Sequence, residues 1–265
     1  MRKNLTTLAS LLFVLLASGC GLLNEKADET KSWTAAKLYS EARNEMASGS
    51  FERAVPLFER LESRYPFGNY AQQAQLEVPY AWYKAGDQAQ ALAAAERFIK
   101  LHPNHPHVDY IYYLRGLINF NDRSGIFDFI SQQDMTERDP KATREAFDSF
   151  KLLVEKYPNS QYTPDAVARM KYLINAMAQY EVHVANYYFR RGAYVAALTR
   201  ATTAVKEYRD APAVEEALYL MVKSYAALGM SDMSDDAKRV FLKNYPDSDF
   251  NKGGRTKNES WWKLW

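Results

Sequence analysis

The sequence predicts an all-α protein, an α-solenoid of about five helical hairpins. The main observation is a spacing in which a glycine is followed five, nine and twelve residues later by mostly small or apolar side chains, and usually by a proline seventeen residues later. This spacing gives Ala54, Phe58, Leu61 and Pro66 after Gly49; Ala91, Ala95, Phe98 and Pro103 after Gly86; Ala197, Ala201 and Ala204 after Gly192; and Ser234, Lys238, Phe241 and Pro246 after Gly229. A further copy lacks the glycine but keeps Ala146, Phe150, Leu153 and Pro158, and an aromatic residue lies four residues before three of the glycines, as Trp82, Tyr188 and Tyr225.

The spacing has a physical explanation. Positions five, nine and twelve lie on one face of a helix, where small residues let a partner helix approach closely. Glycine adopts the left-handed conformation that ends the preceding helix, and proline stops the following one. One such hairpin cannot bury its apolar face alone, whereas stacked copies can. The pattern resembles tetratricopeptide repeats, with their period of roughly 34 residues; the alternative is an ordinary helical bundle whose spacing is a coincidence.

Residues 1–19 have the layout of a bacterial lipoprotein signal peptide. Arg2 and Lys3 precede an apolar run over residues 8–16 that is too short for a transmembrane helix. The stretch LASGC ends in Cys20, the only cysteine, and resembles a lipobox. We expect Cys20 to carry a diacylglycerol and an N-acyl chain, which together give a stable anchor. The alternative is an ordinary signal peptide with a leftover thiol. Gly21, in place of the aspartate that retains lipoproteins in the inner membrane, indicates the periplasmic face of the outer membrane.

The rest of the chain divides into segments by its helix-breaking residues. Residues 20–32 are predicted to be a lipidated tether, 33–160 to hold repeats one to three, and 161–250 to hold repeats four and five. Uninterrupted hairpins are expected over 33–65, 70–101 and 214–245. The third repeat along the chain, between the last two of these, is interrupted by an insertion at 122–139. Residues 164–191 contain no helix breaker and predict one long helix, after which the fourth repeat closes near Tyr208. Residues 251–265, which include Trp261, Trp262 and Trp265, are predicted to be a flexible tail.

Composition and motifs argue against several classes of protein. There are 34 basic and 32 acidic residues, and removal of Arg2 and Lys3 with the signal peptide makes the charges equal, so nucleic-acid binding has no support. No G-x-S-x-G, P-loop, H-E-x-x-H or Rossmann motif is present, and we expect no enzymatic activity. His102, His105 and His107 lie in the stretch HPNHPH, but their spacing fits no zinc pattern, so we interpret them as turn residues.

Five stretches resemble the BamD (ComL) family of outer-membrane assembly lipoproteins. They are RYPFGNYAQQAQ at 64–75, RFIKLHPNHPHVDYIYYLRGL at 97–117, RDP at 138–140, YPNSQYT at 157–163 and RRGAYVA at 190–196. The resemblance implies a scaffold of the β-barrel assembly machinery. Its partners would be a barrel component with POTRA domains, accessory lipoproteins and unfolded outer-membrane protein precursors. It also implies that Arg191 and Arg200 hold the POTRA region. The alternative is that both belong to a solvated helix face. The alternative function is a helical-repeat lipoprotein that coordinates peptidoglycan or cell-division proteins.

The N-terminal half is rich in aromatic residues near its turns and first helices. They are Tyr65, Phe67, Tyr70, Tyr80, Tyr83, Tyr110, Tyr112 and Tyr113. Tyr112 and Trp82 hold repeat-packing positions and are assigned to structure. Our hypothesis is that Tyr65, Phe67, Tyr80 and Tyr83 contribute to a pocket for an extended C-terminal segment of a barrel precursor. The competing interpretation is that these four residues pack hairpins one to three together.

Overall fold

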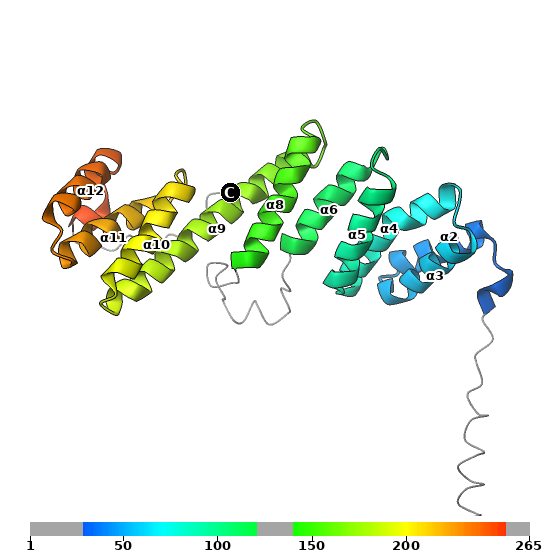
Figure 1. The fold of residues 1–265 in the computed structure, drawn as a ribbon. Coiled ribbons are helices and arrows are strands. Elements are labelled where there is room, and N and C mark those ends of the chain that lie inside the picture. Colours follow the sequence, from blue (N-terminus) through cyan, green and yellow to red (C-terminus); the bar gives the residue numbers. More distant parts are fainter. Residues whose placement is uncertain (1–28, 121–139, 253–265) are drawn as a thin grey trace, which may run out of the picture.

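A computed structural model describes residues 29–120 and 140–252, and all of its regular elements within these two stretches are helical. The hairpins stand side by side in a row that runs from the N-terminal to the C-terminal end (Figure 1). Their helices are α2 (Ala35–Ala47) with α3 (Phe51–Arg64), α4 (Asn69–Ala85) with α5 (Gln88–Leu101), α6 (Val108–Phe120) with α8 (Pro140–Lys156), α9 (Thr163–Arg190) with α10 (Tyr194–Glu207), and α11 (Val214–Ala227) with α12 (Ser231–Asn244). The predicted all-α solenoid of about five hairpins is confirmed.

The helices end where the sequence places their breakers. Gly86 has a φ of 84°, and its N–H closes the last turn of α4 before α5 begins. The second helices end one residue before Tyr65, His102, Tyr157, Tyr208 and Tyr245, and a proline directly follows four of these residues. The long helix expected over residues 164–191 is α9, with 28 residues. Helix ends are local features, and this explains why the spacing locates them well.

The predicted packing positions form the core. Phe58, Phe98, Phe150 and Phe241 are among the largest fully buried side chains, and the alanines predicted beside them are buried as well. Lys238 is the exception, because this residue is exposed and its neighbour Ala237 is buried instead. In the earlier hairpins the residue at the equivalent position is buried, and an α-helix follows each of those hairpins. No α-helix follows α12 among the described residues, so a lysine at this position stays in water.

Two segment boundaries differ from the prediction. The last four residues of the expected tether, Glu29–Ser32, form the 3₁₀ helix η2, in which Thr30 is buried and accepts hydrogen bonds from Arg64. At the other end, the 3₁₀ helix η4 (Asp249–Lys252) extends the fold two residues into the expected tail. The signal peptide, Cys20, the insertion at 122–139 and the three tail tryptophans lie outside the described residues.

Two prolines lie inside helices, Pro56 in α3 and Pro79 in α4. Each removes one backbone donor from its helix. Pro56 is near the start of α3, as expected. Pro79 lies deep in α4, is buried, and does not end the helix, so tertiary packing outweighs the local preference there.

Candidate functional site

The first helices of the hairpins line the inner side of the stack. Contacts between neighbouring hairpins join α2 to α4, α4 to α6 and α9 to α11, in addition to the contacts between consecutive helices. Helices that approach one another across the repeat boundary lie on the inside of the curve, and in solenoids this side forms an extended binding surface. Figure 1 shows these helices following one another along the row.

On four of these first helices, aromatic and charged side chains border the buried core, and most of the aromatic rings pack partly against it. They recur three, four or seven residues apart, which keeps them on one side of each helix. We call this set the aromatic belt. Its members are Tyr39 and Arg43 at α2; Tyr70, Glu77 and Tyr80 at α4; Tyr110, Tyr113 and Phe120 at α6; and Tyr162, Asp165, Arg169 and Tyr172 at α9.

The N-terminal part of the belt is built around an ion pair between α2 and α4. An Arg43 terminal nitrogen donates to Glu77 Oε1 at 2.5 Å, and the rings of Tyr39 and Tyr70 lie 5.6 Å apart beside it. Burial raises the pKa of Glu77, and Arg43 offsets this only in part. Burial also raises the pKa of Tyr110, with a further contribution from Glu77. The hydroxyl of Tyr110 therefore remains protonated and able to donate a hydrogen bond.

The C-terminal part of the belt links α6 to α9. The rings of Tyr113 and Tyr162 are stacked 4.8 Å apart. Asp165 Oδ2 accepts hydrogen bonds from the Tyr113 hydroxyl at 2.7 Å and from Arg169 Nε at 2.6 Å. Burial opposes ionisation of Asp165, but these two hydrogen bonds outweigh it, and the pKa of Asp165 is lowered. The guanidinium of Arg169 also lies 4.9 Å from the Phe120 ring.

This arrangement suits an extended polypeptide. Ring faces accept apolar side chains, and hydroxyl and charged groups next to them can bind backbone amides. Among residues 29–120 and 140–252, no group of three or more histidine, cysteine or acidic side chains is placed to hold a metal ion. Within the same stretches, no helix combines the length and apolarity needed to cross a membrane.

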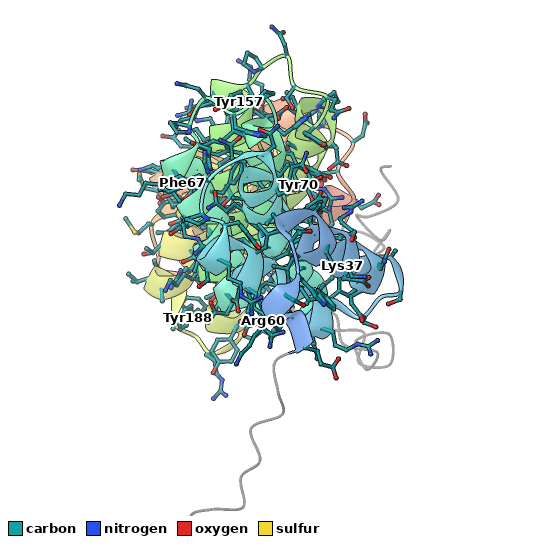
Figure 2. All side chains as sticks on the ribbon, turned by 90° about the vertical axis from the view of Figure 1, so that its right-hand side faces the viewer. Lys37, Arg60, Phe67, Tyr70, Tyr157 and Tyr188 are labelled. Carbon is teal, nitrogen blue, oxygen red and sulfur yellow. The ribbon has the colours of Figure 1, made fainter. Side chains whose placement is uncertain are left out.

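The structure does not bring the four predicted pocket residues together. Tyr80 belongs to the belt, and both Tyr80 and Tyr83 are half-buried against the core of hairpins two and three. Tyr65 and Phe67 lie at the opposite end of α4, a helix about 25 Å long. The Tyr65 hydroxyl donates to the Trp33 carbonyl at 3.0 Å, whereas Phe67 is 91% exposed and projects from the side of the molecule (Figure 2). The sequence contains a signal for the remaining belt positions, namely the spacing of Tyr110, Tyr113 and Phe120.

The two residues assigned to structure are found in the core. Tyr112 is buried and accepts a hydrogen bond from Lys156 Nζ at 3.0 Å. Trp82 is partly buried where the core of hairpins one and two meets the core of hairpins two and three. Both positions therefore serve repeat packing.

The two predicted partner-binding arginines differ in their surroundings. Arg191 is exposed at the end of α9, with its guanidinium 5.3 Å from the Tyr187 ring. Arg200, on α10, pairs with Glu181 of α9 at 3.2 Å, and the Glu181 side chain is only 13% exposed. The Arg191 guanidinium is therefore accessible to a partner's carboxylate. Arg200 could bind such a carboxylate only if it also kept, or gave up, its ion pair with Glu181.

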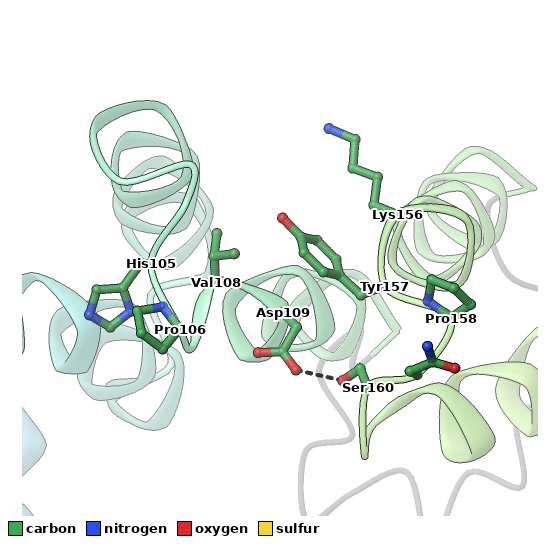
Figure 3. Close-up of a pocket in the computed structure, with 9 residues that line it drawn as sticks. His105, Pro106, Val108, Asp109, Lys156, Tyr157, Pro158 and Ser160 are labelled. Carbon is green, nitrogen blue, oxygen red and sulfur yellow. Dashed lines mark hydrogen bonds between the residues drawn. The ribbon is translucent and has the colours of Figure 1, made fainter.

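A cavity of about 360 Å³ lies between the turn after α5 and the turn after α8 (Figure 3). Its lining includes His105, Asp109, Lys156, Tyr157 and Ser160. The Ser160 hydroxyl donates a hydrogen bond to Asp109 at 2.6 Å, and Lys156 donates one to the Tyr112 hydroxyl. Because these polar groups already have hydrogen-bond partners, we interpret the cavity as the space between two inter-repeat turns and not as a ligand site.

The histidines of HPNHPH lie in the first of these turns. His102 ends α5, and its Nε2 lies 2.5 Å from Gln75 Oε1. Burial and the two neighbouring histidines lower the pKa of His105. The rings of His102 and His105 contact each other and Phe98, and the ring of His107 contacts that of His105. Their positions agree with the interpretation as turn residues.

Comparison with known proteins gives a consistent picture. Residues 31–240 match the family model described as "YfiO: Outer membrane lipoprotein". The chain is 42% identical over 266 residues to the outer membrane protein assembly factor BamD of Neisseria meningitidis serogroup B, with all of both chains covered. It is 38% identical to the protein of the same name from Vibrio cholerae, covering 90% of this chain and 98% of the relative.

Similar solved structures include a putative kinesin light chain with TPR-like repeats. That structure is 14% identical, covers 80% of this chain and 96% of its own, and has a TM-score of 0.35. The family assignment does not depend on it, because the matches in sequence extend from end to end. The chain belongs to the BamD (YfiO) family of outer-membrane lipoproteins.

Proposed function

We propose that this protein is a lipid-anchored periplasmic scaffold of the β-barrel assembly machinery, and that its aromatic belt binds unfolded outer-membrane protein precursors. The observation that carries the proposal is full-length similarity to proteins named outer membrane protein assembly factor BamD. Cys20 would carry the diacylglycerol and the N-acyl chain that hold the scaffold at the outer membrane. A family of assembly factors agrees with the expectation of a protein that is not an enzyme.

The chemistry of the belt matches that of such a precursor. Strands of membrane barrels alternate apolar and polar residues, so an unfolded terminal strand offers apolar side chains along one edge. These side chains can lie on the rings of Tyr110, Tyr113 and Tyr162, while hydroxyl groups bind the backbone. The ion pairs at Arg43 and Asp165 fix the ring positions and supply charge for polar residues or a terminal carboxylate.

We also propose that the fourth hairpin binds the POTRA region of the barrel component. Arg191 offers an exposed planar guanidinium that can pair with a carboxylate through two hydrogen bonds. Arg200 lies on the helix that follows and can contribute if the partner's carboxylate competes with Glu181. Accessory lipoproteins complete the proposed set of partners.

Peptide binding tests the role of the belt. A fluorescent peptide copied from the last strand of a barrel protein is titrated with the purified lipoprotein and followed by fluorescence anisotropy. Tyr113→Phe and Arg169→Gln each remove a polar group of the belt, and we expect each to weaken binding by about five- to tenfold. Phe67→Ala is the matched control at the far end of α4. If Phe67→Ala weakens binding and both belt variants bind normally, the site lies at the turn and the belt proposal is wrong.

A further inference from the structure

The last helix of the described stack has an apolar side that no described residue covers. Met230, Met233 and Val240 are 44%, 45% and 45% exposed. Met233 and Val240 are two turns apart and therefore lie on one face of α12, beside the buried face formed by Ser234, Ala237 and Phe241. We call Met230, Met233 and Val240 the α12 stripe. Terminal repeats of solenoids normally present a polar outer face, so an exposed apolar stripe indicates an interaction.

The surroundings of the α12 stripe are acidic at its N-terminal end. Asp232 is exposed and makes no ion pair with described residues, and Asp236, three residues after Met233 and four before Val240, is paired with Arg239 at 2.8 Å. Carboxylates next to exposed methionines favour an occupant that is both apolar and basic.

The chain itself provides such a segment beyond the described residues. Residues 255–265 contain the apolar side chains Trp261, Trp262, Leu264 and Trp265 and the basic side chains Arg255, Lys257 and Lys263, with Glu259 as the only acidic residue. Large aromatic side chains bury much apolar area, and tryptophan packs well against methionine sulfur.

The start of this segment lies close to α12. The Phe250 ring is buried and stacks on Tyr219 of α11 at 4.9 Å, within the same core as Phe241 of α12. Trp261 follows Lys252 by nine positions in the sequence, and an extended chain of this length reaches about 30 Å. The α12 helix is only about 21 Å long. The tryptophans can therefore reach any part of the α12 stripe.

We propose that residues 255–265 dock on the α12 stripe. The tryptophan rings cover Met233 and Val240, and the basic side chains lie near Asp232 and Asp236. The segment thereby takes the place of a further hairpin and caps the solenoid, in contrast to the flexible tail expected from the sequence. This inference does not depend on the proposed function.

Tryptophan fluorescence tests the docking in the full chain. Trp33→Phe and Trp82→Phe leave only the three tail tryptophans, and circular dichroism checks that this chain folds. We expect a blue-shifted emission and weak quenching by acrylamide. Met233→Asp with Val240→Asp should shift the emission to that of tryptophan in water and raise the quenching several-fold. Leu242→Asp is the matched control, because Leu242 is similarly exposed but lies on the opposite side of α12. It should change neither value.

Methionine oxidation gives a second readout that needs no tryptophan variant. Peroxide should oxidise Met230 and Met233 several-fold faster in a chain truncated after Lys252 than in the full chain, while Met170 on α9 reacts equally in both. Equal rates at Met233 in the two chains would overturn the proposal. If the slow oxidation of Met230 and Met233 in the full chain is lost on dilution, a second copy of the chain covers the α12 stripe, and the proposal is wrong. The proposal is also wrong if these methionines become slow to oxidise only after a partner protein is added.

Discussion

Replacing Gly116 with alanine tests the packing of the third hairpin, whose helices α6 and α8 are far apart in sequence. A Cβ atom at Gly116 would lie within 3 Å of three ring carbons of Phe150, with Cδ1 at 2.5 Å and Cζ at 2.9 Å. Phe150 is fully buried, so its ring cannot move into solvent. Either the ring must leave its preferred rotamer or α6 and α8 must separate.

The expected magnitude follows from two opposing effects. Overpacking a core costs about 1–3 kcal/mol. Alanine is favoured over glycine within a helix by about 1 kcal/mol. Because the new methyl group would lie under 3 Å from the Phe150 ring, we expect the upper part of the overpacking range, about 2–3 kcal/mol. The net destabilisation is then about 1–2 kcal/mol, which lowers the melting temperature by about 2–8 °C for a protein of this size.

Thermal unfolding followed by circular dichroism measures the effect, and a double mutant checks its cause. Phe150→Leu creates space where the new methyl group would lie. The combination Gly116→Ala with Phe150→Leu should therefore be more stable than the sum of the two single changes predicts. A melting temperature of Gly116→Ala equal to or above that of the parent chain, or strictly additive effects, would refute the close contact between α6 and Phe150.

Four further predictions follow from individual side chains. Tyr83→Ala should lower the melting temperature by several degrees because the ring packs against the core, whereas Phe67→Ala should leave it unchanged. Arg200→Glu should reduce co-purification of the barrel component while the circular dichroism spectrum stays the same; full recovery would remove Arg200 from the interface. Burial is outweighed by hydrogen bonds from Tyr113 and Arg169, which lower the pKa of Asp165 in the folded chain, so ionised Asp165 stabilises the fold above the unfolded-state pKa. The stability lost in Asp165→Asn, measured by urea unfolding, should therefore be constant near about pH 6 and shrink below about pH 4. Cys20→Ser should leave the protein uncleaved or soluble, and fractionation of this variant with the outer membrane at full abundance would contradict lipidation.

The hairpins could be predicted because their signals are local. Glycine and proline act on the residues beside them, and three packing positions on one helix face do not depend on the rest of the fold. The burial of Lys238, nine residues after Gly229 in the last repeat, could not be predicted in this way. Whether Lys238 is buried depends on whether another helix follows α12, and a spacing within one repeat does not contain this information. The order at Glu29–Ser32 likewise depends on a distant contact with Arg64.

The belt was harder to predict than the core. Periodicity identifies which face of a helix is apolar, but it does not say whether the opposite face lies inside or outside the curve of the stack. Proximity in sequence therefore grouped Tyr65 and Phe67 with Tyr80, although α4 separates them in space. The partners of Asp165, which come from α6 and α9, become visible only in the folded chain.

The most direct test of the central claim is to purify the affinity-tagged, lipidated chain from outer membranes and identify the proteins that accompany it. We expect a barrel protein with POTRA domains, together with accessory lipoproteins and crosslinkable barrel precursors. The double variant Arg191→Glu with Arg200→Glu should recover less of the barrel protein. Recovery of peptidoglycan-bound or cell-division proteins without any barrel component would contradict a role in barrel assembly.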